Sequence, residues 1–172
     1  VGSDYSEDLR IGPEILKHHA DVYRRLRNTL RFMIGNLDGF GTAERLPLAE
    51  MPELDRWVLH RLWELDCLVR RCCVDFDFHS LFTALHTFCV TDLSAFYFDI
   101  RKDALYCDPL ASPVRRAART VLDEAFRCLV TWLAPVLCFT AEEAWLARNE
   151  AGAAEGSVHL GEFPTPPTEW RD

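Results

Sequence analysis

Four arginines and an asparagine crowd into one short stretch of the chain, YRRLRNTLRF at positions 23–32. Guanidinium groups bind phosphate through charge-assisted, often bidentate hydrogen bonds. A helix over residues 13–37 would turn by about 100° per residue. Its outer side would then carry Lys17, Arg24, Asn28 and Arg31, with Arg25 and Arg27 on the flanks. The chemistry that this pattern is suited to, if the arginines are free, is binding of a phosphate backbone.

The apolar residues of the same stretch recur at helical spacing on the opposite side. This stripe consists of Ile15, Val22, Leu26, Leu30, Met33 and Leu37. The helix is therefore expected to have one face for a protein core and one face for a partner. A charged outer face also keeps a helix soluble, and its arginines can pair with carboxylates on the bundle surface, so the pattern alone leaves both readings open.

The charge balance of the whole chain at first opposes a nucleic-acid partner, because the net charge is −8. Screening reduces this objection, since the Debye length in the cell is about 8 Å. From Arg10 to Arg31 the sequence has six basic residues and only two acidic ones, Glu14 and Asp21. We therefore expect a locally cationic helix in an acidic protein.

Length and composition favour a single globular domain with its own core. The chain has 172 residues, of which 49% are hydrophobic and 27% charged. No apolar run approaches the ~20 residues that span a bilayer, so we expect no membrane partner and a cytoplasmic location. The seven cysteines are odd in number and lie mostly in apolar helical patterns, which favours reduced thiols and no metal site.

The periodicity predicts an all-α fold, an antiparallel bundle of four long helices with a short fifth and an extended tail. We expect a lead-in over 1–12, the bundle over 13–150 and a flexible or extended tail over 151–172. The helices after the first are expected over about 53–74, from about 78 to 106, from Pro113 to Pro135, and from a capping box at Thr140 to about 148. Asp77 and Ser112 are predicted to cap the third and fourth helices.

The predicted core of these helices follows from their apolar positions. The second helix would bury Leu54, Val58, Leu62, Leu65, Val69 and Cys72. The third would bury Leu81, Leu85, Phe88, Phe96 and Ile100. The fourth would bury Ala118, Val121, Leu122, Ala125, Leu129 and Trp132.

Signals for other chemistry are weak. The eight glycines form no phosphate-binding loop, and no cysteine or serine has a nucleophile signature. His79, His86 and Cys89 allow a metal reading, but core or capping roles are favoured because three or four convergent ligands are needed. Asp92, Asp99 and Asp103 are expected to be solvated or paired with basic residues.

A second polar stripe runs along the predicted second helix at seven-residue intervals. It consists of Arg56, Trp63 and Arg70. An outward tryptophan between cations could stack on an unpaired base, but Trp63 could equally be buried under the tail.

Seven ordered segments resemble the anticodon-binding domain of isoleucyl-tRNA synthetases of the bacterial type, and together they span roughly residues 4–164. They are DYSED (4–8), EILK (14–17), YRRLRNT with RF (23–29 and 31–32), LDRW (54–57), DFH (77–79), FYFDI with KD (96–100 and 102–103), and LAP with FTAEEAW (133–135 and 139–145). Valyl, leucyl and methionyl enzymes share the helical domain, but the first segment is of the isoleucyl kind.

The resemblance implies a domain that binds the anticodon stem-loop of tRNA(Ile) and follows a catalytic domain upstream in the same chain. The parent ligase uses ATP with magnesium, and often zinc in a C-terminal region. Its His-x-Gly-His and Lys-Met-Ser-Lys-Ser motifs are absent here, as are the editing domain and the zinc region. We therefore expect no cofactor and no catalytic residue in this segment, a monomeric state, and tRNA binding as its role.

For the residues, the resemblance and the charge pattern together suggest two clusters. Arg24, Arg25, Asn28 and Arg31 would contact the RNA backbone, and Arg56 with Trp57 would form a second cluster where the helices converge. Arg27 is expected to form a structural ion pair with a carboxylate such as Asp99. The alternatives are the same domain of a valyl enzyme and a helical protein-interaction module without RNA binding.

Overall fold

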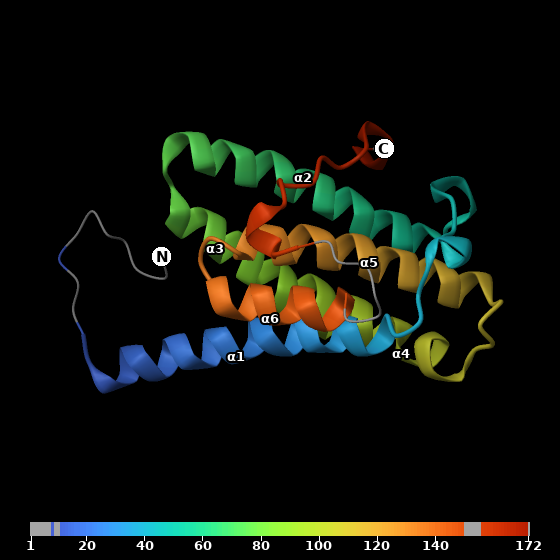
Figure 1. The fold of residues 1–172 in the computed structure, drawn as a ribbon, viewed down its shortest axis with the longest axis horizontal. Coiled ribbons are helices and arrows are strands. Elements are labelled where there is room, and N and C mark those ends of the chain that lie inside the picture. The colour runs from blue at the N-terminus through green and yellow to red at the C-terminus, as the bar shows by residue number, and fades with distance from the viewer. Residues whose placement is uncertain (1–7, 9–10, 150–155, 172) are drawn as a thin grey trace.

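The computed structural model describes residue 8, residues 11–149 and residues 156–171. The lead-in predicted for 1–12 and the first part of the predicted tail lie largely outside these residues. Within the described part of the chain there are helices and no strand, so the predicted all-α class is confirmed. The successive long helices run back and forth along one axis (Figure 1).

The long elements are α1 (Pro13–Asn36), α2 (Glu53–Asp75), α3 (Phe78–Thr87), the π-helical segment η3 (Phe88–Tyr97), α4 (Phe98–Cys107), α5 (Pro113–Leu133) and α6 (Cys138–Asn149). Short 3₁₀ turns occupy η1 (Thr42–Glu44), η2 (Leu48–Glu50), η4 (Val158–Leu160) and η5 (Thr168–Arg171). Because α3, η3 and α4 are continuous, they form one long third helix. The predicted caps are also present, since Asp77 accepts from the Ser80 amide at 3.0 Å and Ser112 accepts from the Arg115 amide at 3.5 Å.

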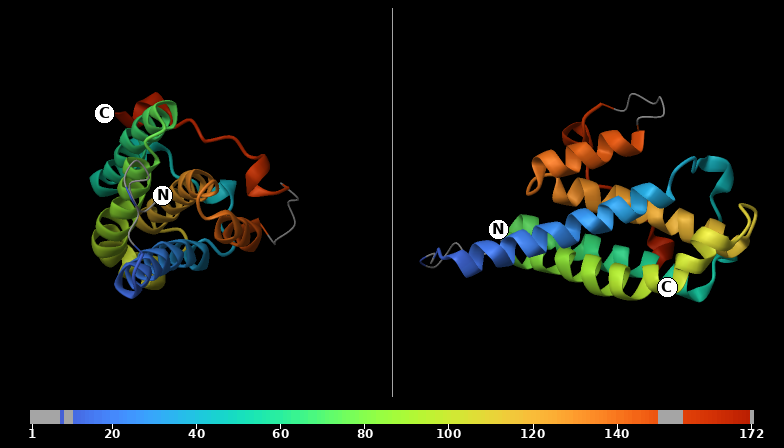
Figure 2. Two further views of the ribbon diagram at one scale, coloured as in Figure 1. Left: turned by 90° about the vertical axis from the view of Figure 1, so that its left-hand side faces the viewer. Right: turned by 90° about the horizontal axis from the view of Figure 1, so that it is seen from below.

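The third helix separates α1 from α2. α1 packs mainly against α5, η3 and α6, whereas α2 packs mainly against α5, α3 and η5. Figure 2 shows α5 in the middle of the assembly, with the other long helices around it. Fifteen residues of α5 are buried, including all six that the sequence pattern assigned to the core, which is typical of a central helix.

The rotation of α1 is set by its central residues. Leu26, Leu30 and Met33 are at most 3% exposed and point into the core. Burying each such side chain is worth about 1.5–3 kcal/mol, so the helix cannot turn about its axis without a large loss. The predicted stripe fails at its first position, because Ile15 is exposed. The start of α6 lies beside the middle of α1, because Thr140 contacts Tyr23. The turns of α1 that precede Tyr23 extend past the bundle, which leaves Ile15 exposed.

The π-helical segment changes which side of the third helix is buried. The sequence pattern placed Phe96 and Ile100 in the core, but both are exposed, and Leu93, Tyr97 and Phe98 are buried instead. A π-helix has i→i+5 hydrogen bonds and more residues per turn than an α-helix, so five-residue steps replace steps of three and four. Phe88, Leu93 and Phe98 follow this spacing.

Two hydroxyl groups stabilise the π-helical segment where it meets α1. Ser94 donates to the Cys89 carbonyl, five residues earlier, at 2.7 Å. Thr29 of α1 lies 3.0 Å from the Ser94 hydroxyl and 3.4 Å from the same carbonyl. The Thr29 side chain is buried, and these hydrogen bonds help to fix the register between α1 and the third helix.

A buried ion pair joins α2 to the third helix. The Asp55 side chain is inaccessible to solvent, accepts from the Tyr97 hydroxyl at 2.6 Å and forms a salt bridge with Arg101. Burial, with a further contribution from Asp55, raises the pKa of Tyr97 well above its ordinary value, so the hydroxyl remains a donor. The Asp55 charge is therefore paired and fully hydrogen-bonded, as burial requires.

Arg119 of α5 anchors the end of α1 and the loop after it. It donates to the backbone carbonyls of Asn36 and Asp38 and pairs with Glu44 at 2.6 Å. The last carbonyls of a helix have no partner within the helix, and Arg119 satisfies one of them. The loop over 38–52 also buries Phe40, so this connection is fixed to the bundle.

The described part of the tail packs against the bundle. Val158 of η4 and Trp170 of η5 are buried, and the Trp170 carbonyl lies 3.3 Å from His60 Nδ1 of α2. Arg70 of α2 donates to the Pro164 carbonyl. The described tail therefore covers part of α2.

The helix from Phe78 to Cys107 is long and apolar enough to cross a membrane, with a mean hydropathy of 1.2 in its best window. From the sequence, no apolar run long enough to span a bilayer was expected. Core helices of soluble proteins meet the same criterion, and this one has Leu85, Phe88 and Leu93 buried inside the bundle.

Replacing Asp55 by alanine should destabilise the bundle strongly, because Arg101 and Tyr97 would lose their partner in a buried site. We expect a loss of about 3–5 kcal/mol in the free energy of unfolding, measured by urea denaturation. The control is Asp99→Ala, which removes an exposed pair with Lys102 and should change the free energy of unfolding far less. Equal losses in the two variants would contradict the role assigned to Asp55.

Candidate nucleic-acid interface

The polar side of α1 forms a ridge between two neighbouring elements, α6 on one flank and the third helix on the other. We call Arg24, Arg25, Asn28 and Arg31 the α1 ridge. All four are exposed, because burial of Leu26 and Leu30 turns the opposite side of the helix inward. The four α1 residues predicted as a site therefore lie along one surface.

The arginines of the ridge differ in their partners. Within the described residues, Arg25 and Arg31 form no ion pair. Arg24 pairs with Asp21 at 2.5 Å, one turn earlier, with its own side chain 69% exposed. An exposed pair of this kind is worth at most about 1 kcal/mol, so a phosphate can replace Asp21. The ridge thus offers guanidinium groups that an anion can reach.

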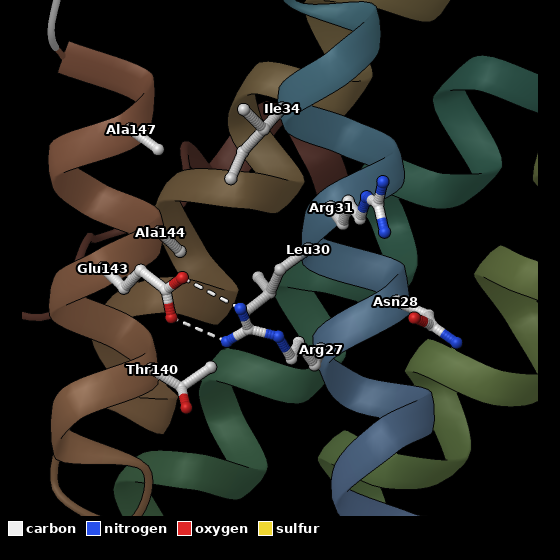
Figure 3. Close-up of a pocket in the computed structure, with 9 residues that line it drawn as sticks. All are labelled: Arg27, Asn28, Leu30, Arg31, Ile34, Thr140, Glu143, Ala144 and Ala147. Carbon is white, nitrogen blue, oxygen red and sulfur yellow. Dashed lines mark hydrogen bonds and ion pairs between the residues drawn. The ribbon is translucent and has the colours of Figure 1, made fainter.

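Arg27 has a different role, because it joins α1 to α6 through an ion pair that we call the Arg27 tie. Its two terminal nitrogens donate to the two carboxylate oxygens of Glu143 at 2.6 and 2.8 Å (Figure 3). The Glu143 pairing raises the pKa of Arg27, and Arg27 lowers the pKa of Glu143. The predicted structural ion pair of Arg27 is present, but the suggested partner was wrong, since Asp99 pairs with Lys102 at 2.7 Å.

The surface between α1 and α6 is a groove of about 310 Å³. Its lining residues are Arg27, Asn28, Leu30, Arg31, Ile34, Thr140, Glu143, Ala144 and Ala147. Figure 3 shows Arg27 reaching across this groove to Glu143, while Arg31 stays on the side of α1 and Asn28 extends from the other flank. The Thr140 hydroxyl lies 3.0 Å from the Tyr23 hydroxyl. These contacts hold α6 at a fixed position beside the ridge.

Thr140 is inside α6 rather than at its N-terminus. The helix begins at Cys138, and the Ala141 amide donates to the Leu137 carbonyl at 2.8 Å. The predicted capping box at Thr140 is therefore wrong. Sequence reasoning missed that this hydroxyl, like Glu143, points toward α1.

A second groove of about 340 Å³ follows the other flank of the ridge. It is lined by Asn28, Phe32, Ser94, Phe98, Asp99, Lys102 and Tyr106. Asn28 lines both grooves and therefore marks the crest between them. The two aromatic rings of Phe32 and Phe98 stack on each other, with centroids 4.2 Å apart.

Arg25 lies near His86 of α3. Burial first, and then the positive charges of Arg25 and His18, lower the pKa of His86. The imidazole is therefore neutral at neutral pH and adds no charge to the cationic surface.

Arg56 and Trp57 do not join the α1 ridge. They lie on α2, across the third helix from α1. Arg56 is exposed, whereas Trp57 is half-buried and packs edge-on against Phe96 with ring centroids 5.5 Å apart. A partner that contacts both the α1 ridge and these two residues would have to extend over the third helix.

The polar stripe of α2 is partly covered by the tail. Arg171 lies over the Trp63 ring at 5.7 Å, and Arg70 pairs with Asp66 at 2.7 Å. Of the two readings left open for Trp63, the contacts favour packing beneath the tail. Stacking of Trp63 on a base would require the tail to leave α2.

The sequence reasoning also missed the contribution of α4. Lys102 and Tyr106 line the second groove, although the third helix was expected to fray near Tyr106. The available signal was the polar spacing of Asp99, Lys102 and Tyr106 at three and four residues, which places them on one side of a helix. Among the described residues, no group of three histidine, cysteine or carboxylate side chains could hold a metal ion.

Residues 55–172 match the family model described as "Anticodon-binding domain of tRNA ligase". The whole chain is 55% identical to the isoleucine–tRNA ligase of Gluconobacter oxydans, of which it covers 18%. Over 171 residues, 99% of the chain, it is 57% identical to the isoleucine–tRNA ligase of Ruegeria pomeroyi, of which it covers 17%. The chain thus spans less than a fifth of the length of these relatives.

Removing the Arg27 tie should loosen α6 without removing the free arginines of the ridge. For Arg27→Ala we expect faster amide hydrogen exchange in α6, measured by mass spectrometry, because the Glu143 pair is lost. The charge-swapped double variant, Arg27→Glu with Glu143→Arg, should restore protection. Unchanged exchange in Arg27→Ala would contradict the role of this pair.

The same tie should depend on pH through Glu143. Its pKa is below the ordinary 4.5, so the stabilisation is fully present above that value and is lost as the pH falls through the lowered pKa. Protection of α6 amides, corrected for intrinsic exchange, should fall in this range. The control is Glu143→Gln, in which that pH dependence should disappear.

Proposed function

The chain belongs to the family of anticodon-binding domains of tRNA ligases, and from this premise we propose that it binds the anticodon stem-loop of tRNA(Ile) as one domain of a longer isoleucine–tRNA ligase. The observation that carries the proposal is the α1 ridge, with Arg25 and Arg31 unpaired among the described residues. Identities of 51–57% to isoleucine–tRNA ligases support the isoleucine enzyme over the valine enzyme.

The mechanism of binding follows from the arrangement of α1. Arg24, Arg25 and Arg31 neutralise phosphates of the RNA backbone and release counterions, which supplies affinity and orientation. The two grooves beside the ridge are then next to the bound backbone. Unpaired bases of a loop can be splayed out and contacted in such grooves. Arg56 and Trp57 would serve a part of the RNA that reaches across the third helix.

The rest of the ligase would perform the chemistry. We propose that a catalytic domain elsewhere in the longer chain uses ATP and magnesium to join isoleucine to the tRNA. This segment itself would hold no cofactor and no catalytic residue. It would position the tRNA in the cytoplasm as part of a monomeric enzyme.

Neutralising the free arginines should weaken RNA binding without unfolding the protein. We expect Arg25→Gln and Arg31→Gln each to lower the affinity for a labelled stem-loop carrying an isoleucine anticodon, measured by fluorescence anisotropy. Each variant should also reduce the slope of log K against log salt by about 0.7–0.9, the contribution of one phosphate contact. Circular dichroism should be unchanged.

The matched control is Arg71→Gln, which removes an exposed arginine on α2 that forms no ion pair among the described residues. Its affinity and salt slope should equal those of the unmodified protein. Binding that does not depend on salt, or an equal effect of all three variants, would contradict the assignment to the α1 ridge. A fall in helicity would show that the arginines are structural.

A further inference from the structure

The groove between α1 and α4 differs from the groove between α1 and α6 in the kind of surface it offers. Its walls carry three aromatic residues, Phe32, Phe98 and Tyr106. The α1–α6 groove has aliphatic walls, and its strongest polar groups, Arg27 and Glu143, already bind each other. Of the two grooves, the α1–α4 groove is therefore the one with a surface on which a flat aromatic ligand can stack.

Tyr106 is the aromatic residue of this groove whose ring is available. Phe98 is 5% exposed and stacks on Phe32, so those faces are already in contact. Tyr106 is 63% exposed, and no other aromatic ring of the described residues packs on it. A large exposed aromatic side chain at the rim of a groove is typical of a platform for a stacked base.

The polar groups of the same groove can contact the edge of a base. Within the described residues, the Asn28 amide has no hydrogen-bond partner, and it offers both a donor and an acceptor. Asp99 uses Oδ1 for Lys102, which leaves Oδ2 as a free acceptor. A carboxylate only accepts, so it binds N–H donors on the edge of a base. An exocyclic amino group offers two such hydrogens, whereas uracil offers one ring N–H between two carbonyl oxygens that repel a carboxylate, so a base with an amino group is preferred.

The volume and the neighbouring charge suit one base of a single strand. About 340 Å³ lies at the lower end of the range for small-molecule clefts, about 300–1,000 Å³. Asn28 belongs both to this groove and to the ridge. A backbone held by Arg31 on one side and by Lys102, which is half exposed, on the other would bring a base to the groove.

We propose that the α1–α4 groove is a subsite for one unpaired base of the RNA, with Tyr106 as its stacking partner and Asn28 and Asp99 as contacts to its edge. This inference rests on the proposed function. It assigns a base-contacting role to α4, in addition to the phosphate contacts of α1.

The test measures binding of labelled stem-loops to the 172-residue chain and its variants. We expect Tyr106→Leu to weaken binding by about 5- to 150-fold, the range given by loss of one base–aromatic stack. Tyr106→Phe should recover most of this loss, because the ring remains. The control is Phe139→Leu, which alters a side chain 92% exposed at the start of α6 and outside both grooves, and should bind as the unmodified protein does.

The stacked base is located by a series of stem-loops that are abasic at one loop position each. At one position only, the difference between the unmodified protein and Tyr106→Leu should disappear. At that position, uracil should bind more weakly than a base with an amino group, and Asp99→Ala should reduce this preference.

Three outcomes would overturn the subsite. In the first, Tyr106→Leu binds normally while Arg31→Gln binds weakly, which removes the subsite and leaves the proposed function intact. In the second, Tyr106→Leu weakens all abasic stem-loops equally, which shows that its ring stacks on no base. Normal binding by both the Tyr106→Leu and the Arg31→Gln variants would remove the proposed function together with the subsite.

Discussion

Burial of Leu26, Leu30 and Met33 determines the direction of every polar residue of α1. With about 100° between successive residues, this rotation sends Arg27 toward α6, Arg31 outward, and Phe32 toward the third helix. The core contacts therefore separate the arginines of one short segment into a structural group and a free group. The proposed RNA surface depends on this separation, because a rotated α1 would lose both the tie to Glu143 and the crest between the two grooves.

The π-helical segment is the second constraint on the surface. Its longer turn exposes Phe96 and Ile100 and buries Tyr97 and Phe98. This register also brings Asp99 and Lys102 beside Asn28 in the second groove. An α-helical periodicity continued through these residues would predict a different face, which is the error that sequence reasoning made. Part of its stabilisation comes from Thr29, which is 60 residues from Cys89, and helical periodicity does not reveal a contact at that distance in the chain.

The fold class, the helix bounds and much of the core could be predicted because periodicity and capping are local properties. The start of α2, the Ser112 cap and the buried face of α5 follow from residues close to one another in sequence. Partners could not be predicted in the same way. Glu143 is 116 residues from Arg27, and the cover over Trp63 comes from Arg171. Such contacts depend on the spatial order of the helices, with the third helix between α1 and α2.

The central claim is that Arg25 and Arg31 contact RNA whereas Arg27 holds α6. The most direct measurement is the rate at which phenylglyoxal modifies each arginine, followed by mass spectrometry with and without a saturating stem-loop RNA. We predict that bound RNA slows modification of Arg25 and Arg31 and leaves the rates at the exposed Arg71 and Arg127 unchanged. Arg27 should react slowly even in the free protein, because Glu143 binds its guanidinium. Equal rates at Arg25 and Arg31 with and without bound RNA would contradict the claim.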